Sequence, residues 1–367
     1  MKLKKANKKV HKWLSIPLGA ILLIICLTGA ILVFQKEILE ISNPEWYNVK
    51  EVKSKAIPLD QLIPMVNRQL IDNRVANVEI NKNPAKTYKM GLEEGFRVSV
   101  FVDQYTGQIS GEYSVREHPF FTVMSLHRWL LDGSHTWGKQ IVGWSTLLFI
   151  LIVITGLCYH SKKKKENYII HFKNGTQRMM MGMHNTLGTY ASIVLIILAL
   201  TGLMWSFEWY RNSIFYIFGD RQQTEESHGK GGGKGKGKNK KKENTINYQS
   251  WQAISDNILN QESKYDYIRI SDGTVSAHPD NTYRTRVQDK IDFNKESGAI
   301  EKISYFKDQD VKSKVWAWTY SLHVGDYWGI WSKILTFICC LIGASLPITG
   351  YYLTIKRWMK KNRKVRK

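Results

Sequence analysis

The chain has 367 residues, a formal net charge of +22 and a mean hydropathy of -0.30. The length allows two or three domains, and the average hydropathy is that of a soluble protein. Four runs without Asp, Glu, Lys or Arg contradict that average, because each is long enough to cross about 30 Å of hydrocarbon as a helix. They cover residues 14–34, 141–159, 187–207 and 334–355. The pattern excludes a soluble globular protein and predicts four transmembrane helices.

The first run is longer than the apolar stretch of a typical signal peptide, and no A-x-A cleavage site follows it. We therefore expect a retained anchor. All four cysteines, Cys26, Cys158, Cys339 and Cys340, lie inside the apolar runs. The segments between the runs thus have no disulfide framework and must fold on their own apolar cores.

Basic residues cluster at the N-terminus, between the second and third runs, and after the fourth. By the positive-inside rule these three segments lie in the cytoplasm, and the two long segments lie outside. The basic run 229–242 falls in an external segment, where the rule is weak, and its Gly/Lys composition predicts a flexible linker. The net charge is mainly a topology signal, so we expect contact with membrane lipid and none with nucleic acid.

The chain divides near residue 172 into two copies of one unit, a helix, an external segment and a second helix. His11 precedes a Thr-Gly pair in the first run by the same number of residues as His184 does in the third. Each external segment then ends in Ser-Leu-His, and each closing run contains another Thr-Gly pair. The matched positions are Thr28-Gly29 and Thr201-Gly202, His127 and His323, and Thr155-Gly156 and Thr349-Gly350.

This repeat gives the predicted domain boundaries. They are a basic N-terminus (1–13), transmembrane helices (14–36, 139–160, 184–208 and 333–355), external domains (37–138 and 209–332), a basic loop (161–183) and a basic tail (356–367).

The external segments have mixed α/β patterns. In the first, apolar residues at helical spacing predict a helix over 59–73, and alternation predicts strands over 97–102 and 108–113 around a turn. The second has a helical pattern at 251–259 and strand patterns at 267–270 and 285–293, with a turn at 294–298. The predicted fold class is a membrane α-helical protein with two α+β external domains.

Four of the ten histidines occupy matched positions in the repeat. Topology places His11 and His184 at the cytoplasmic face and His127 and His323 at the external face. Paired imidazoles from facing helices are what axial ligation of a haem iron requires. The spacing from His127 to Thr155 corresponds to about 42 Å of helix, too long for one straight span, so we expect His127 and His323 on short interfacial segments.

Several further roles stay open at this point. Arg128 and Lys12 are weaker candidates for partners of haem propionates, and His135 and His160 are alternative ligands. Six tryptophans are expected to form an interfacial belt, namely Trp129, Trp137, Trp316, Trp318, Trp328 and Trp331. The remaining histidines, His118, His171, His228 and His278, are expected to be ordinary loop residues. No Walker, dinucleotide-binding or HExxH motif occurs, and no apolar run contains a carboxylate.

The sequence resembles the PepSY-associated transmembrane family, whose members include bacterial inner-membrane ferric-siderophore reductases. The resemblance covers nearly the whole chain and rests on five segments: 11–14 with 27–29, 126–130, 184–188 with 200–202, 322–325, and the strand–turn signature at 102–109. The second copy of that signature, 293–300, departs by having Ser297 in place of Thr.

The resemblance implies two haem b groups, bound through His11, His127, His184 and His323, with no catalytic residue beyond these iron ligands. It implies a bacterial inner-membrane protein with cytoplasmic termini that reduces a ferric siderophore or another Fe(III) chelate externally. We expect electrons to pass from a cytoplasmic or membrane-pool donor through the inner pair to the outer pair. The alternatives are a non-enzymatic regulator that binds a protease or envelope partner, and a haem or metal carrier without turnover.

Overall fold

The computed structural model describes residues 2–160, 170, 172, 175–219, 246–260 and 264–365. The basic run 229–242 and most of the basic loop expected at 161–183 lie outside these residues, as do His171 and His228. Within the described ranges, four helices are long and apolar enough to cross a membrane. This agrees with the prediction from the sequence.

The four long helices form a bundle in which each contacts two others. They are α1 (Lys2–Val33), α6 (Trp137–His160), α7 (Thr176–Ser206) and α11 (Ile330–Val365). Helix α1 packs against α6 and α11, and α7 packs against the same two helices, so α1 and α7 stand diagonally across the bundle. Each helix extends beyond its uncharged run, which places His11 and His184 inside helices rather than before them.

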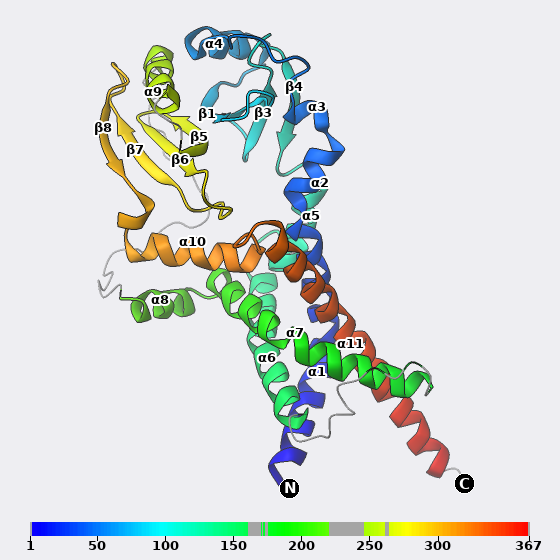
Figure 1. Cartoon of the computed structure of the whole chain (residues 1–367). Coiled ribbons are helices and arrows are strands. Elements are labelled where there is room, and N and C mark those ends of the chain that lie inside the picture. Colours follow the sequence, from blue (N-terminus) through cyan, green and yellow to red (C-terminus); the bar gives the residue numbers. More distant parts are fainter. Residues whose placement is uncertain are drawn as a thin grey trace.

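Two shorter helices, α5 (Pro119–Trp129) and α10 (Val311–Val324), precede the closing helix of each unit and lie where the bundle meets the sheet (Figure 1). Helix α5 ends at Leu130, which has a left-handed backbone with φ of 51°. Helix α10 ends at Gly325, whose φ of 80° favours glycine. These breaks separate His127 and His323 from the spans that follow, as their spacing predicts.

A single eight-stranded antiparallel sheet lies outside the bundle, with strand order β4-β3-β2-β1-β5-β6-β7-β8. Its strands are β1 (Val75–Asn81), β2 (Tyr88–Leu92), β3 (Val98–Val102), β4 (Ile109–Ser114), β5 (Tyr265–Ser271), β6 (Thr274–Pro279), β7 (Asp289–Phe293) and β8 (Ile300–Ser304). Each unit contributes four consecutive strands, and the two sets join through β1 and β5. The two predicted α+β segments therefore share one continuous sheet, because strand β1 of the first pairs with strand β5 of the second and neither edge is left open at the junction.

Helices α4 (Leu59–Gln69) and α9 (Tyr248–Asn260) pack side by side on one face of this sheet. Their apolar residues join those of both strand sets in one buried cluster, which includes Leu62, Val66, Trp251 and Ile254. The opposite face of the sheet is turned toward the bundle (Figure 1). The two copies thus share a core as well as a sheet.

The repeat is also visible in matched turns. Gly107 has φ of 72° and donates its backbone N–H to Asp103, and Gly298 has φ of 73° and donates to Asn294. Both turns lead into the last strand of a unit. The helix predicted over 59–73 ends earlier, at Gln69, because Leu70 is already extended.

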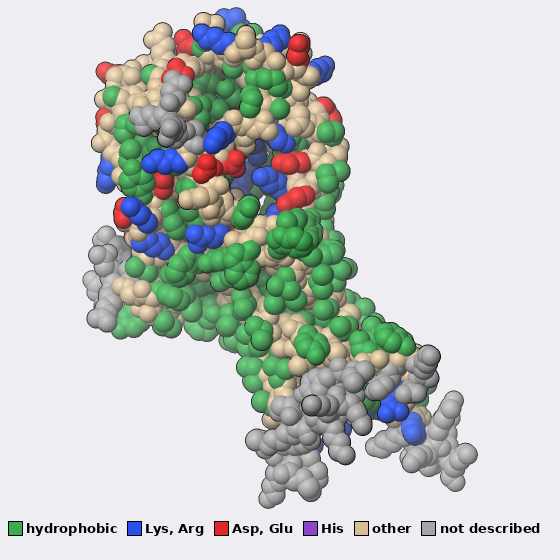
Figure 2. All heavy atoms as spheres, in the orientation of Figure 1, with side chains coloured by type: hydrophobic (Ala, Val, Ile, Leu, Met, Phe, Trp, Pro, Cys, Tyr) green, Lys and Arg blue, Asp and Glu red, His purple; other side chains and the backbone are tan. Residues whose placement is uncertain are grey.

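In the described ranges the remaining helices are α2 (Gln35–Ser42) and α3 (Pro44–Tyr47), which connect α1 to the sheet, α8 (Glu208–Ile217), which follows α7, and a 3-10 turn at Phe306–Asp308. In Figure 2 hydrophobic side chains cover the visible face of the bundle, whereas charged side chains gather on the sheet region. This distribution fits a multi-pass membrane protein with an external sheet domain.

Candidate functional site

The structure brings the four repeat-matched histidines together in two pairs. The ring centroids of His11 in α1 and His184 in α7 lie 6.1 Å apart. Those of His127 in α5 and His323 in α10 lie 6.2 Å apart. We call these the terminal-end pair and the sheet-end pair, after the end of the bundle at which each lies. His11 and His184 come from the diagonally placed helices α1 and α7, and His127 and His323 come from α5 and α10, which occupy equivalent places in the two units. Each pair therefore contains one histidine from each unit.

Each of these imidazole rings rests on a Thr-Gly pair of a different helix. A Cβ added at Gly29, Gly156 or Gly202 would lie 3.1 Å from the Cε1 atom of His127, His11 or His323, respectively. At Gly350 the corresponding distance to His184 is 3.6 Å. Glycine at these positions leaves room for the ring against the helix backbone. The Thr-Gly pairs, which the sequence shows only as repeat markers, are therefore seats for the histidines.

Hydrogen bonds to the same seats fix the orientation of the rings. Nδ1 of His127 donates to the carbonyl oxygen of Ile25 at 2.9 Å, and Nδ1 of His323 donates to that of Leu198 at 3.1 Å. Nδ1 of His11 donates to the carbonyl oxygen of Ile152 at 2.9 Å. A carbonyl only accepts, so the proton is on Nδ1 and the lone pair is on Nε2.

The threonine hydroxyls complete these seats. Thr28 Oγ1 lies 3.1 Å from Nδ1 of His127, and Thr201 Oγ1 lies 3.1 Å from Nδ1 of His323. Nδ1 of His184 lies 2.9 Å from Thr349 Oγ1. Partners of this kind orient metal-ligating histidines in proteins and raise their basicity.

The sheet-end pair is neutral near pH 7. Burial lowers the pKa of His127 to about 4; the hydrogen bond to Ile25 opposes this shift, and the positive charge of Arg128 adds to it. Burial also lowers the pKa of His323 to about 3, with His127 as the next cause. Neutral imidazole is the form that binds a metal through Nε2.

The geometry of the pairs fits axial ligands on opposite sides of one metal. Two metal–nitrogen bonds of about 2 Å and two ring radii of about 1.1 Å place the ring centroids about 6 Å apart. Among the described residues no cluster of three or more His, Cys, Asp or Glu side chains is suited to holding a metal ion. Each pair by itself would offer a metal two imidazole nitrogens. A haem, whose macrocycle leaves two axial positions, fits this donor set.

The other histidines have different surroundings. The ring of His135 packs against Trp129 at a centroid distance of 4.1 Å, which makes it part of the loop after α5 rather than of a pair. His118 is the N-cap of α5 and stacks on Phe120. The expectation of a loop residue is wrong for His278, which lies in strand β6, is buried and stacks on Tyr267. The side chain of His160 lies outside the described part of the chain.

The tryptophans expected in an interfacial belt divide into two groups. Trp137, Trp318, Trp328 and Trp331 are exposed, as lipid-facing residues would be. Trp129 is buried, and Trp316 packs against Trp205, whose ring lies 5.2 Å from that of His323. Trp205 is a neighbour of the sheet-end pair that the sequence does not single out, because nothing in the first unit matches it: Leu32 stands at the equivalent position.

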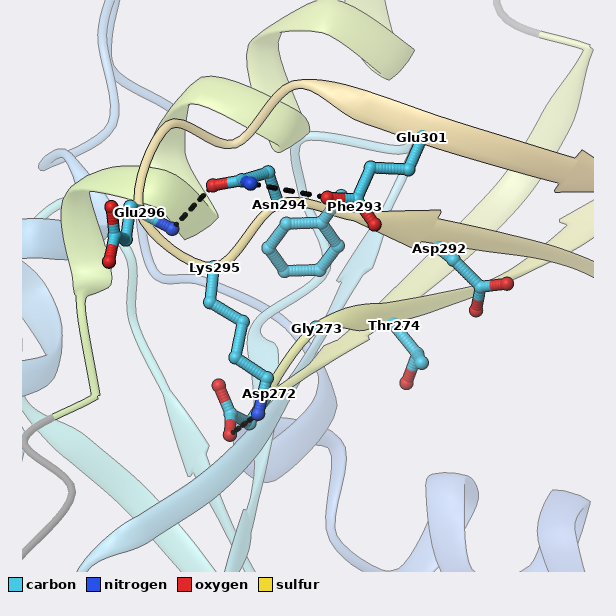
Figure 3. Close-up of a pocket in the computed structure, with 9 residues that line it drawn as sticks. All are labelled: Asp272, Gly273, Thr274, Asp292, Phe293, Asn294, Lys295, Glu296 and Glu301. Carbon is cyan, nitrogen blue, oxygen red and sulfur yellow. Dashed lines mark hydrogen bonds and ion pairs between the residues drawn. The ribbon is translucent and has the colours of Figure 1, made fainter.

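A separate open pocket lies at the turns β5–β6 and β7–β8, at the ends of these strands away from α10 (Figure 3). Its polar groups are engaged with one another. Lys295 forms an ion pair with Asp272, and the amide of Asn294 donates to Glu301 at 3.2 Å. This pocket contains none of the four histidines, so the pairs remain the candidate functional site.

The arrangement of spans, sheet and seats runs through the whole chain, and so does its match to a known family. The model of the PepSY-associated TM region matches residues 8–357. The chain belongs to this family. No curated protein matches it. In this PepSY-associated protein all four histidines and all four Thr-Gly seats lie within the matched region.

Proposed function

We propose that this PepSY-associated protein binds haem b at its two histidine pairs and transfers electrons across the membrane to a ferric chelate on the external side. The observation that supports this proposal is the presence of two pairs, one at each end of the bundle, with every Nδ1 held by a seat on another helix. A structural histidine needs no such matched partner. When bound, haem b supplies a one-electron Fe(III)/Fe(II) couple.

The chain itself holds the two pairs at a fixed separation. Helix α1 carries His11 at one end and the seat of His127, Thr28-Gly29, at the other. Helix α7 does the same with His184 and the seat of His323. The distance along either helix is about 25 Å at 1.5 Å per residue, close to the thickness of the hydrocarbon core.

The reaction that we propose is a one-electron reduction. The Fe(III) chelate takes up one electron, and Fe(II) leaves because hard oxygen ligands hold it less tightly. The electron comes from a membrane quinol or a reduced cytoplasmic carrier. By the positive-inside rule, the basic ends of the chain support a terminal-end pair at the cytoplasmic face of a bacterial inner membrane and a sheet on the external side.

The test is an absorption spectrum of the full chain, purified in detergent from haem-replete cells, before and after dithionite. We expect the reducible spectrum of a bis-histidine haem, and re-oxidation when a ferric siderophore is added. A His118→Ala variant is the matched control, since this histidine caps α5 outside the pairs. A colourless preparation would contradict haem binding and favour the regulator. A haem spectrum without re-oxidation would contradict the reductase activity and favour a carrier.

A further inference from the structure

Three arginines from separate elements lie in the region where the sheet faces the bundle. Arg97 lies on the turn between β2 and β3, Arg128 lies in the last turn of α5, and Arg286 lies on the connection between β6 and β7. Each guanidinium group lies over an aromatic ring: Arg97 over Phe96 at 5.4 Å, Arg128 over Trp129 at 5.2 Å, and Arg286 over Tyr320 at 4.8 Å. Such contacts hold a guanidinium group in place and leave its N–H donors free.

The sheet register brings Arg97 close to α5. Val98, the first residue of β3, pairs with Ser114, the last residue of β4, and β4 leads directly into α5. Arg116, on that connection, lies over the same Phe96 ring as Arg97. The surrounding protein lowers the pKa of Arg128 by desolvation, and the neighbouring charge of Arg97 lowers it further.

The sheet-end pair lies directly beside these arginines. Arg128 follows His127 in the chain, and its charge contributes to lowering the pKa of both His127 and His323. Tyr320 lies one turn before His323 in α10 and interacts electrostatically with Arg286 and Arg97. Arg128 and Arg286 therefore lie next to the two helices that carry the sheet-end pair, and Arg97 interacts with both of their surroundings.

Three carboxylates in the same region each have one partner, although Oε2 of Glu37 and Oδ1 of Asp326 are buried without a hydrogen bond. Glu37 pairs with Lys333, and Glu79 pairs with Arg269. Asp326 accepts hydrogen bonds from the backbone N–H and the hydroxyl of Thr285. Within the described ranges, by contrast, none of the three arginines lies within ion-pair distance of a carboxylate. The three guanidinium groups thus lack a directly paired carboxylate in this part of the chain, and a bound anion would stabilise them.

We propose that Arg97, Arg128 and Arg286 form the docking site for an anionic, carboxylate-bearing Fe(III) chelate next to the sheet-end pair. This proposal rests on the proposed function, and it names the class of substrate. Guanidinium forks match carboxylates in a bidentate manner. Arg97 and Arg286 are exposed, and Figure 2 shows an opening rimmed by charged side chains at the level where the sheet meets the bundle, so a soluble chelate has access. A cationic chelate is disfavoured at this site.

Direct binding of Ga(III)–citrate tests the proposal, because gallium is redox-inert and the measurement needs no electron transfer. Isothermal titration calorimetry with the full chain in detergent should show binding that weakens with salt. Arg97→Gln and Arg286→Gln should each raise Kd about tenfold, as expected for the loss of a charge-assisted hydrogen bond. Arg97→Lys keeps the charge and should have a smaller effect. Arg68→Gln on α4, at the opposite face of the sheet, is the matched control and should leave Kd unchanged.

Haem propionates share the carboxylate chemistry of the chelate, so haem content is measured on the same samples. We expect Arg97→Gln and Arg286→Gln to keep their haem. Loss of haem with unchanged Ga(III)–citrate binding would show that the arginines serve propionates and would overturn the docking site. Absence of binding to the unmodified chain, or the same Kd in Arg97→Gln, Arg286→Gln and Arg68→Gln, would overturn it too. Intact binding without iron reduction would contradict the proposed function alone.

Discussion

The histidine seats predict that Gly202 and Gly350, which contact different histidines, respond differently to the same substitution. A Cβ at Gly202 would lie 3.1 Å from the Cε1 atom of His323, closer than an ordinary contact. A Cβ at Gly350 would lie 3.6 Å from the same atom of His184, which is a normal van der Waals distance. Both glycines are in transmembrane helices and follow a threonine, so each is a control for the other.

The two effects of Gly→Ala have opposite signs. Alanine favours a helix over glycine by about 0.8–1 kcal/mol. Overpacking that forces a neighbour to move costs about 1–3 kcal/mol. Gly350→Ala should therefore be stabilising by up to about 1 kcal/mol, because only the first effect applies. Gly202→Ala should be roughly neutral to about 2 kcal/mol destabilising, since the ring of His323 must shift by a few tenths of an ångström.

Thermal unfolding of the two variants in the same detergent measures this difference. Gly350→Ala should raise the unfolding midpoint, and Gly202→Ala should leave it unchanged or lower it. Haem content gives a second readout: a displaced His323 ring should reduce it in Gly202→Ala, and Gly350→Ala should retain it. Equal shifts of the unfolding midpoint in the two variants, in either direction, would refute the idea that the histidine ring packs more closely on Gly202 than on Gly350.

Three further predictions concern the ligand pairs, a helix cap and the shared sheet. His323→Ala should remove about half of the haem, and adding His127→Ala should remove no more, because both histidines are proposed to hold the same haem. Haem content is measured by the pyridine haemochrome assay, and a double variant that loses all haem would contradict the pairing. Asp310 caps α10 by accepting the backbone N–H of Ser313, so Asp310→Ala should cost about 1 kcal/mol in thermal unfolding. The hydrogen bond from the Ser313 hydroxyl lowers the pKa of Asp310 in the folded protein. The stabilisation that this carboxylate gives to α10 should therefore be present above the pKa of about 4 that Asp has in the unfolded chain, and should be lost as pH falls through the lower pKa of the folded state. An effect of Asp310→Ala that does not depend on pH would count against the cap. Ile270 is fully buried in the common core. Ile270→Ala should lower the free energy of unfolding by about 2–4 kcal/mol and should speed amide hydrogen exchange in β1–β4 as well as in β5–β8. Faster exchange confined to β5–β8 would argue for two independent domains.

The sequence alone determined the features that depend on local pattern. A sufficiently long run without charged residues defines a membrane helix, because each residue of a helix adds a fixed rise and the hydrocarbon core has a fixed thickness. The repeat identified the four histidines, and the spacing after His127 and His323 required the breaks that occur at Leu130 and Gly325. The turn glycines Gly107 and Gly298 were equally readable, since a positive φ selects for glycine.

Strands β1, β2, β6 and β8 were not predicted, because short strands with one polar face give little signal over a few residues. Whether these short strands form depends on the neighbouring strands with which they pair. The pairing of β1 with β5, which joins the two copies, links segments from different halves of the chain and is set by backbone hydrogen bonds that any sequence can make.

The tertiary structure also decided how each histidine is used. The sequence shows that His127 and Thr28-Gly29 recur in the repeat, and only the packing of α5 against α1 shows that one is the seat of the other. In the same way, Arg97 and Arg286 are ordinary loop residues in the sequence, and only the fold brings Arg97 near Arg128 and Arg286 onto Tyr320. Periodicity along a chain fixes which elements form, but contacts between elements depend on the packing free energy of the whole molecule, and the candidate site is built from such contacts.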